Sequence, residues 1–328
     1  MSIVPPPAAD ATPPDLSVVI VSYNTREMTL ECLDTLAEAL TRLDAEVFVV
    51  DNASTDGSVD AVRAAYPDAV VIANDDNAGF GAANNQAFAR AAGRYLLLLN
   101  SDAFPEPRAL EALVDFAERH PDAGVVGPRT LCPDGSLQQS CFHYPSPWLA
   151  WRENLWLHRL MRRHPRFGDM GGWPHDEVRE VDFVIGACML VRRDAYDAVG
   201  GFDERFFMYA EESDWQKRIG AAGFGVWFTP DAVVTHIGGA SGAKDKARIN
   251  NHFFDSLDAY TLKHHGRFGL VNLRAAMAIG CAIRAAGWCG AGLLARASDR
   301  RETAAAKLRL MRWLVWRQLT HWPRSAPA

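Results

Sequence analysis

The fold of this 328-residue chain is decided by four short apolar runs, SVVIVS (17–22), EVFVVD (46–51), AVVIA (69–73) and RYLLLLNSD (94–102). Runs rich in β-branched residues and leucine are typical of strands buried on both faces of a sheet. Helical patterns separate them at 28–40, 57–65 and 81–92. Strands and helices alternating at this spacing predict an α/β fold with a mostly parallel sheet.

Polar residues follow each run: Tyr23 and Asn24, Asp51 and Asn52, Asn74 to Asn77, and Asn100 to Asp102. Ligands of open α/β sheets bind outside the carboxyl ends of the strands. Asn, Asp and Gly are also the commonest turn residues, which is the simpler explanation. Because four consecutive strand ends carry polar residues, we predict a ligand site there.

The second half of the chain has a less regular pattern. Residues 132–180 mix Pro, Trp, His and Arg, which predicts a long excursion over the sheet. A strand is predicted within 181–193, and a helix from Glu211 to Ala222 that Gly223 ends. Two short strands are predicted at the end of this half, VWF (226–228) and AVVTH (232–236).

The net charge of −6 is unevenly distributed. Residues 263–328 contain 12 basic and 2 acidic residues and carry +10, so residues 1–262 carry −16. The acidic body argues against nucleic acid as a partner, whereas the basic, apolar tail predicts amphipathic helices that contact an anionic membrane through 268–320. Tail helices packed on the domain are the alternative. We expect three parts: a disordered leader (1–15), a main domain (16–262) and the helical tail (263–328).

The six cysteines, at positions 32, 132, 141, 188, 281 and 289, form no CxxC pair and no zinc-type spacing. Scattered thiols are typical of a reducing cytosol. The proline-rich N-terminus has no basic region typical of a secretory signal. We therefore expect a cytoplasmic protein that is peripheral at the inner face of the membrane.

Three positions are candidates for chemistry. Asp102 beside Asn100 places oxygen ligands at a strand end, which suits a hard divalent cation, although a lone Asp is often a cap. The cluster Glu211, Glu212 and Asp214 offers a general base, although acidic residues are also favoured in any first helical turn. His236 ends a predicted strand and is a candidate metal ligand, although a single His is usually structural.

In chain order, these residues fall within motifs that resemble family-2 glycosyltransferases of the GT-A fold, and among them the bacterial rhamnosyltransferase-like branch. The motifs are SVVIVSYN (17–24), VVDNASTDGS (49–58), NAGFGAANNQA (77–87), LLLLNSDAFPE (96–106), GACMLVRR (186–193), GFDERFFMYAEESDW (201–215) and the His236 segment. They cover about 17–241, and seven weak motifs in the family's order make a specific match.

The resemblance implies an α/β/α sandwich with a nucleotide-binding sheet, and roles for individual residues. The donor nucleotide-sugar is held by residues from four strand ends: Tyr23, Asn24, Asp51, Asn77, Gly79, Asn100, Ser101 and Asp102. Asp102 and His236 match metal ligands for Mg²⁺ or Mn²⁺. Glu212 matches the base that removes the acceptor proton, so the transfer inverts the anomeric configuration.

The sequence departs from the family pattern at two positions. Asn100 replaces the first acid of the DxD motif, which leaves Asp102 and His236 as the metal ligands. Glu212 stands where Asp is commoner, so Glu211 and Asp214 remain alternative bases.

The rhamnosyltransferase-like pattern favours dTDP-L-rhamnose as donor, with a UDP-sugar as the alternative. A glycan or lipid-linked glycan is the expected acceptor, in cell-surface polysaccharide synthesis. It is expected against the 132–180 excursion, where tryptophans can stack on sugars: Trp148, Trp151, Trp156 and Trp173.

Two enzyme classes are disfavoured by the segment after the first strand. A nicotinamide-dependent oxidoreductase requires GxGxxG there, and this chain has YNTREM. A sugar nucleotidyltransferase requires a glycine-rich basic loop at the same place, which is also absent from the sequence. A non-catalytic nucleotide- or glycan-binding scaffold of the same fold remains an alternative.

Overall fold

The central strand β1 (Leu16–Ser22) is flanked in parallel by β2 (Ala45–Asp51) and β4 (Tyr95–Asn100), and β3 (Val70–Ala73) extends the sheet beyond β2. These elements belong to a computed structural model that describes residues 12–157, 173–238, 246–294 and 298–321. The four strands are the four apolar runs of the sequence. The predicted parallel sheet is confirmed here.

Beyond β4 the sheet continues in the order β11, β6, β12 and β5. β11 (Cys188–Arg192) is antiparallel to both β4 and β6 (Ala123–Leu131), whereas β12 (Gly225–His236) is parallel to β6. β5 (Ala103–Pro105) pairs antiparallel with the end of β12. Shorter strands complete the set: β7 (Leu137–Gln138), β8 (Cys141–Phe142), β9 (Arg179–Glu180) and β10 (Phe183–Val184).

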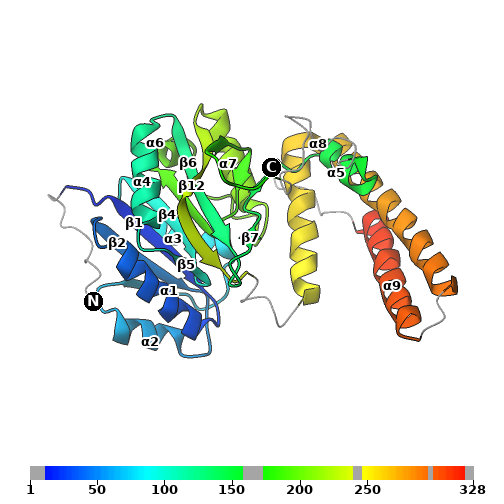
Figure 1. The fold of residues 1–328 in the computed structure, drawn as a ribbon, viewed down its shortest axis with the longest axis horizontal. Coiled ribbons are helices and arrows are strands. Elements are labelled where there is room, and N and C mark those ends of the chain that lie inside the picture. The colour runs from blue at the N-terminus through cyan, green and yellow to red at the C-terminus, as the bar shows by residue number, and fades with distance from the viewer. Residues whose placement is uncertain (1–11, 158–172, 239–245, 295–297, 322–328) are drawn as a thin grey trace. The chain divides into compact units, whose positions relative to one another are not determined.

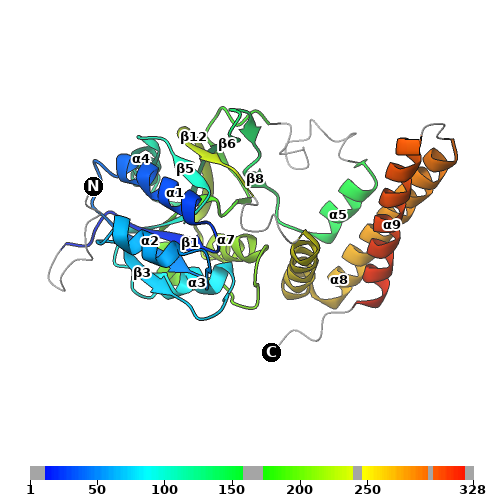
Figure 2. The same cartoon turned by 90° about the horizontal axis from the view of Figure 1, so that it is seen from below.

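Helices cover both faces of the sheet, as Figures 1 and 2 show. One face carries α1 (Arg26–Ala39) and α4 (Ala109–Arg119), with α2 (Ser58–Ala65) beside α1; the other carries α3 (Phe80–Phe88), α6 (Arg193–Val199) and α7 (Glu211–Ala221). Alternate residues of each strand face opposite layers. Val18 and Ile20 pack into the α1–α4 core, while Val19 is equally buried on the other face. The predicted α/β/α sandwich is therefore confirmed.

Four predicted elements differ in extent. The helix expected at 81–92 ends at Phe88. The strand expected over 181–193 divides into β10 and β11, because the chain turns between them around Gly186. The two short strands expected at 226–228 and 232–236 are one strand, β12, whose register against β6 shifts between Thr229 and Val233, around Pro230.

The chain forms two compact units that group its segments differently from the predicted domains. Unit 1 contains residues 1–144 and 173–256, and unit 2 contains 145–172 and 257–328. Part of the 132–180 excursion therefore belongs with the C-terminal helices. The reason is apolar packing, since Ala150 of α5 (Pro147–Asn154) joins the core of Leu270, Leu273 and Ala276.

Unit 2 contains α5, most of α8 (Lys246–Leu294) and α9 (Ser298–Thr320), and α9 lies alongside the second part of α8 (Figure 1). α8 bends at Gly266, whose φ of 66° is left-handed. The buried Asp258 accepts hydrogen bonds from Arg274 at 2.6 Å and Arg317 at 3.5 Å. This buried ion-pair cluster joins the two helices.

The predicted amphipathicity of the tail is wrong for α9. Its buried residues are Ala304, Arg317 and Gln318, so the side that packs within unit 2 is small and polar. Apolar side chains instead lie exposed among basic ones along the helix: Leu310, Trp313, Trp316 and Leu319 beside Arg309 and Arg312. The segment Asn251–Leu293 is long and apolar enough to cross a membrane, by length and composition only. Of its most apolar 18-residue stretch, 39% is buried within the structure.

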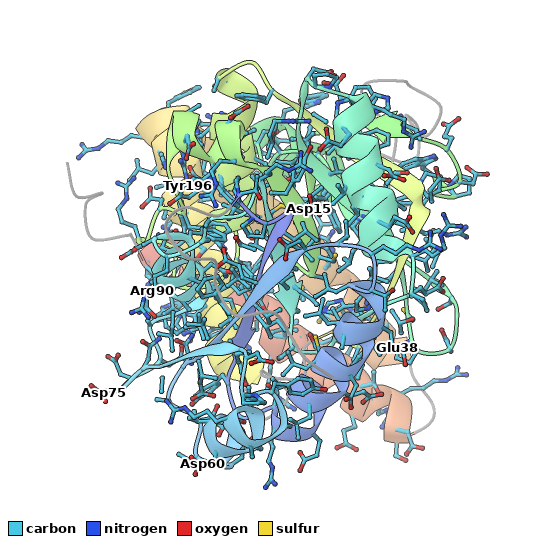
Figure 3. The ribbon with its side chains drawn as sticks, turned by 90° about the vertical axis from the view of Figure 1, so that its left-hand side faces the viewer. Asp15, Glu38, Asp60, Asp75, Arg90 and Tyr196 are labelled. Atoms are coloured by element: carbon cyan, nitrogen blue, oxygen red, sulfur yellow. The ribbon has the colours of Figure 1, made fainter. Side chains whose placement is uncertain are left out.

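The predicted leader 1–15 lies mostly outside the described residues, but its end is attached to unit 1. Asp15 forms an ion pair with Arg94 at 2.8 Å, and Pro14 accepts a hydrogen bond from the Arg94 amide. The exposed surface of unit 1 carries acidic side chains. Glu38, Asp60 and Asp75 point outward in Figure 3, in agreement with the negative charge of this part of the chain.

Candidate functional site

The carboxyl ends of β1 and β2 are joined through the Asp51 carboxylate and the Asn24 side chain. Asp51 Oδ1 accepts a hydrogen bond from the Ser54 amide at 2.8 Å, and Ser54 Oγ accepts one from the Asn24 amide at 2.8 Å. Asn24, with φ of 53°, accepts a further bond from the Thr55 amide. Asp51 is buried, and its Oδ2 has no hydrogen-bond partner. Tyr23 next to this loop is half-buried.

A cluster of hydroxyl groups joins β1 to β4. Ser22 and Thr25 are 3.2 Å apart, and Thr25 Oγ1 is 3.0 Å from Ser101 Oγ. Ser22 pairs in register with Asp51 on one side, and Val21 pairs with Asn100 on the other. Asp51 and Asn100 are therefore two strand spacings, roughly 10 Å, apart. Ser101 holds this frame together through its hydroxyl group.

The loop before α3 is fixed by side-chain amides and by Phe207. Asn77 Oδ1 accepts from the Gly79 amide at 3.0 Å, and Asn52 donates to the Gly79 carbonyl at 3.2 Å. Gly79 has φ of 86°, and a Cβ there would lie 2.5 Å from the Phe207 carbonyl oxygen. Only glycine allows this close approach. The loop after β3 is thereby packed against the segment that leads into α7.

Asp102 and His236 are brought together by the pairing of β5 with β12. His236 pairs with Ala103, and the Ile237 amide donates to the Asp102 carbonyl at 3.0 Å. His236 Nε2 is 3.3 Å from Asp102 Oδ1 and 3.4 Å from Asn100 Nδ2. Both Asp102 and His236 are buried. The two residues predicted from the sequence as metal ligands are therefore in direct contact, and Asn100 lies beside them.

Asp102 and His236 fit a divalent cation as two of its ligands. Adjacent ligands of an octahedral Mg²⁺ at about 2.1 Å are about 3.0 Å apart, close to the separation of Oδ1 and Nε2. Across the parts of the chain that the structure describes, no three His, Cys, Asp or Glu side chains are grouped to hold a metal. Such two-residue sets complete Mg²⁺ coordination with water and substrate phosphates.

The acidic pair begins α7 and follows a strained segment. Tyr209 and Ala210 have φ of 68° and 65°, which is uncommon for residues other than glycine. Burial and the charge of Glu212 raise the pKa of Glu211 well above its usual value, and burial also raises the pKa of Glu212. Oε2 of each carboxyl group is buried and has no hydrogen-bond partner. The two carboxyl groups therefore form a buried acidic pair in which the charge of one disfavours ionisation of the other.

Asp214, the third acidic candidate, lies in a different environment. It is fully buried and accepts from Arg218 Nε at 3.0 Å, and Arg218 also donates to the carbonyls of Val199 and Gly201. These bonds tie α7 to the end of α6. The environment of Asp214 is that of a packing residue, because a base must reach solvent or substrate.

The predicted sugar-stacking tryptophans are dispersed. Trp148 is exposed, Trp151 packs in the unit 2 core, and Trp156 lies under the Arg284 guanidinium at 4.6 Å. Trp173 is buried in unit 1, stacked on His175. Burial leaves Trp173 no face for a sugar, so that part of the prediction is wrong.

Sequence reasoning missed the contacts of Gln138 and Phe207. Gln138 Oε1 lies 2.7 Å from His236 Nδ1, and Phe207 packs on Gly79. Gln138 falls within the irregular 132–180 stretch, and no local pattern distinguishes it from its neighbours. Its partner lies 98 positions away, so only the tertiary structure places the two together.

The comparisons with known proteins decide the family. Residues 17–200 match the model of "Glycosyl transferase family 2". This match covers more than half of the chain. The chain belongs to that family. As a family-2 glycosyltransferase, it has the GT-A fold.

Similar proteins place it in the rhamnosyltransferase-like branch. The chain is 34% identical to a Mycobacterium tuberculosis protein named "N-acetylglucosaminyl-diphospho-decaprenol L-rhamnosyltransferase", over 71% of this chain and 79% of that protein. It is 26% identical to "Glycosyltransferase AglE" of Haloferax volcanii, over 69% and 68% of the two chains.

A solved structure shows the same fold. The mannosyltransferase PcManGT of Pyrobaculum calidifontis, in complex with GDP-Man and Mn²⁺, superposes with a TM-score of 0.56 and 20% identity, over 96% of this chain and 91% of that one.

Proposed function

We propose that this glycosyltransferase transfers L-rhamnose from dTDP-L-rhamnose to a lipid-linked glycan, with inversion at the anomeric carbon and with Mg²⁺ or Mn²⁺. The observation that carries the transfer chemistry is the 3.3 Å approach of Asp102 Oδ1 and His236 Nε2 at the strand ends. The name of the Mycobacterium tuberculosis relative supports the sugar and an acceptor with a diphosphate-linked polyprenyl lipid.

The donor is proposed to lie across the ends of β1, β2 and β4. Asp51 Oδ2 is buried without a partner, so it offers an acceptor for the N–H of the base or a ribose hydroxyl. Asp102 and His236 would hold the cation at the donor diphosphate. When bound, the cation neutralises the negative charge that develops on the leaving diphosphate.

Glu212 is proposed as the base. Glu212 is half-buried, whereas Glu211 is buried, so Glu212 is the more exposed of the two carboxylates. Its raised pKa makes it a stronger base than an ordinary glutamate. Glu211, whose pKa is raised well above its usual value, is proposed to be the protonated member of the pair.

The step conserves atoms and electrons. The acceptor oxygen forms a bond to the anomeric carbon while the bond from that carbon to the diphosphate oxygen breaks, and the diphosphate keeps the electron pair. The acceptor proton passes to Glu212. Because attack and departure occur on opposite faces, the product has the inverted configuration.

Nucleotide binding is the first test of this proposal. We expect dTDP with Mg²⁺ or Mn²⁺ to raise the unfolding temperature of the whole protein, since a ligand at about 100 times its Kd adds roughly 2.7 kcal/mol of stability. The effect is expected to fall when a chelator replaces the metal. A preference for UDP would redirect the donor to a UDP-sugar. No response to dTDP, UDP or GDP would favour the scaffold alternative.

Sugar transfer is the second test. Incubation with dTDP-L-rhamnose and N-acetylglucosaminyl-diphospho-polyprenol is expected to yield a rhamnosylated lipid, and NMR of the product gives the anomeric configuration. Retained configuration would contradict the role of Glu212. Release of dTDP without a glycosylated lipid would contradict the acceptor.

We propose that unit 2 holds the protein at the inner face of an anionic membrane. Its exposed apolar residues include Phe268, Leu293, Trp313 and Trp316, and the surrounding segment is strongly basic. Apolar side chains enter the interface while Lys and Arg attract anionic headgroups. A lipid-linked acceptor would then be met at the same surface.

A double substitution of Trp313 and Trp316 by serine tests this surface. We expect co-sedimentation with phosphatidylserine vesicles to fall by about tenfold, because two exposed indole rings are lost. Trp148→Ser, an exposed tryptophan of α5 in the same unit, serves as the control. Unchanged sedimentation of the double variant would remove α9 from the proposal.

A further inference from the structure

Gln138 makes two hydrogen bonds to one residue of the site. It lies on β7, which pairs with β6 at Thr130. Its Oε1 is 2.7 Å from His236 Nδ1, and its Nε2 donates to the His236 carbonyl at 3.3 Å. A single amide group therefore contacts both the ring and the backbone of His236.

The two contacts together determine which ring nitrogen carries the proton. A backbone carbonyl can only accept, so the amide NH₂ of Gln138 must face it. The amide oxygen then faces Nδ1, and Nδ1 must be the donor. In the neutral ring with this tautomer, the Nε2 lone pair faces Asn100 Nδ2 at 3.4 Å and Asp102 Oδ1 at 3.3 Å.

We propose that Gln138 is a positioning residue that holds the His236 ring in the tautomer and orientation required to bind a divalent cation through Nε2. The inference rests on the proposed function, because it concerns the cation of that site. Removing the group that accepts a hydrogen bond from the second nitrogen of a metal-binding His typically lowers metal affinity by about 10–100-fold.

Gln138 also joins β7 to β12, and a purely structural role would leave cation binding unchanged. Two substitutions separate these roles. Gln138→Leu removes both hydrogen bonds, whereas Gln138→Glu keeps an oxygen for Nδ1–H and removes only the bond to the backbone. A structural role predicts that both variants lose stability and bind the cation normally. A positioning role predicts that only Gln138→Leu binds the cation weakly.

The experiment measures Mn²⁺ affinity by electron paramagnetic resonance in the presence of dTDP and without an acceptor. We expect Gln138→Leu to bind Mn²⁺ about 10–100-fold more weakly than the wild type, and Gln138→Glu to bind within about threefold of it. Gln139→Leu is the matched control, because the Gln139 amide donates to the Cys141 carbonyl instead. Its affinity is expected to equal that of the wild type.

Each result has a distinct meaning. Equal Mn²⁺ affinity in the wild type and Gln138→Leu would overturn the positioning role while leaving the cation site intact. Absence of Mn²⁺ binding by the wild type would overturn the cation site of the proposed function, and the role of Gln138 with it.

A second measurement does not depend on the folding of any Gln138 variant. Nitrogen-15 NMR of the wild type, with His236→Gln to assign the signal, reports the tautomer directly. We expect the His236 signal to show a protonated Nδ1 and an unprotonated Nε2. The opposite tautomer would overturn the proposal.

Discussion

Buried carboxylates are treated differently in the two units. In unit 1, Asp51 at the end of β2 and Glu211 and Glu212 at the start of α7 each keep one oxygen without a hydrogen-bond partner. In unit 2, Asp258 accepts from two guanidinium groups, those of Arg274 and Arg317. Both arrangements bury acidic groups, but only Asp258 is paired with basic side chains.

We propose that the difference distinguishes carboxylates that are available to a ligand from those that stabilise the fold. Burying a charge without a partner costs free energy, so a native protein pairs it or leaves it for a ligand or proton. Asp258 is paired with two arginine side chains, and these ion pairs join α8 to α9. Asp214, paired with Arg218 inside α7, is of the same kind although it lies three residues from Glu211. Proximity in sequence therefore does not establish a catalytic role.

Glu212→Gln gives the largest expected effect and tests whether this carboxylate acts on the substrate. The neutral amide cannot accept the acceptor proton, so the transfer rate is expected to fall by about 10²–10⁴-fold. The measurement is turnover of dTDP-L-rhamnose, with dTDP affinity measured in parallel. Asp214→Asn is the control, expected to lower stability and to leave the rate per folded molecule within a few-fold of wild type. An unchanged rate in Glu212→Gln would mean that Glu212 is not the base.

Asp258→Ala tests whether the paired carboxylate of Asp258 stabilises the fold. Removing the carboxylate leaves two buried guanidinium groups without their partner, and breaking a buried ion pair in this way costs about 3–5 kcal/mol. We expect urea to unfold unit 2 of this variant at a clearly lower concentration than in the wild type. The fluorescence of the unit 2 tryptophans monitors this unfolding. Stabilisation of unit 1 by dTDP should persist. Asp255→Ala, at an exposed position of the same helix, provides the control. An equal loss of stability in both variants would mean that the buried ion pairs of Asp258 do not stabilise unit 2.

Asp51→Asn is expected to change binding more than stability. Its unpartnered Oδ2 is predicted to accept a hydrogen bond from the donor nucleotide, and a hydrogen bond to a charged group contributes about 1.5–3 kcal/mol. The expected result is dTDP binding weakened by roughly 10–100-fold in calorimetry, since 1.4 kcal/mol is tenfold in Kd. Unfolding of the free protein should be little altered. Wild-type affinity in this variant would place the nucleotide elsewhere.

Glu211→Gln has the smallest expected effect, on the pH dependence of stability. The pKa of Glu211 is raised in the folded protein, so the folded state binds more protons than the unfolded state above about pH 4.3. Stability therefore decreases as the pH rises from there through the folded pKa. The glutamine cannot titrate, so we expect a smaller loss of unfolding temperature between pH 5 and pH 8. Glu38→Gln, at an exposed position, controls for the loss of one carboxylate. A slope steeper than that of the wild type in Glu211→Gln would contradict the raised pKa of Glu211.

The local elements were largely predictable, because each is encoded in a short window. The four apolar runs predict β1 to β4 to within a few residues, and the pattern from Glu211 onward predicts α7. The polar residues at the strand ends were predictable for the same reason, since parallel strands bring their carboxyl ends to one edge. Asp102 and His236 were selected from their positions at strand ends and matched to metal ligands by the family resemblance, and the structure places them in contact.

Relations between distant segments were not predictable from these patterns. The sequence by itself determined the alternation of strands and helices, the acidic and basic parts of the chain, and which side chains stand at strand ends, because periodicity and charge are local properties. Only the tertiary structure decided that β5 pairs with β12, that Gln138 contacts His236, that α5 packs with the C-terminal helices, and that Asp214 is neutralised by Arg218. Those contacts depend on which surfaces meet when the core is buried, and burial is a property of the whole chain.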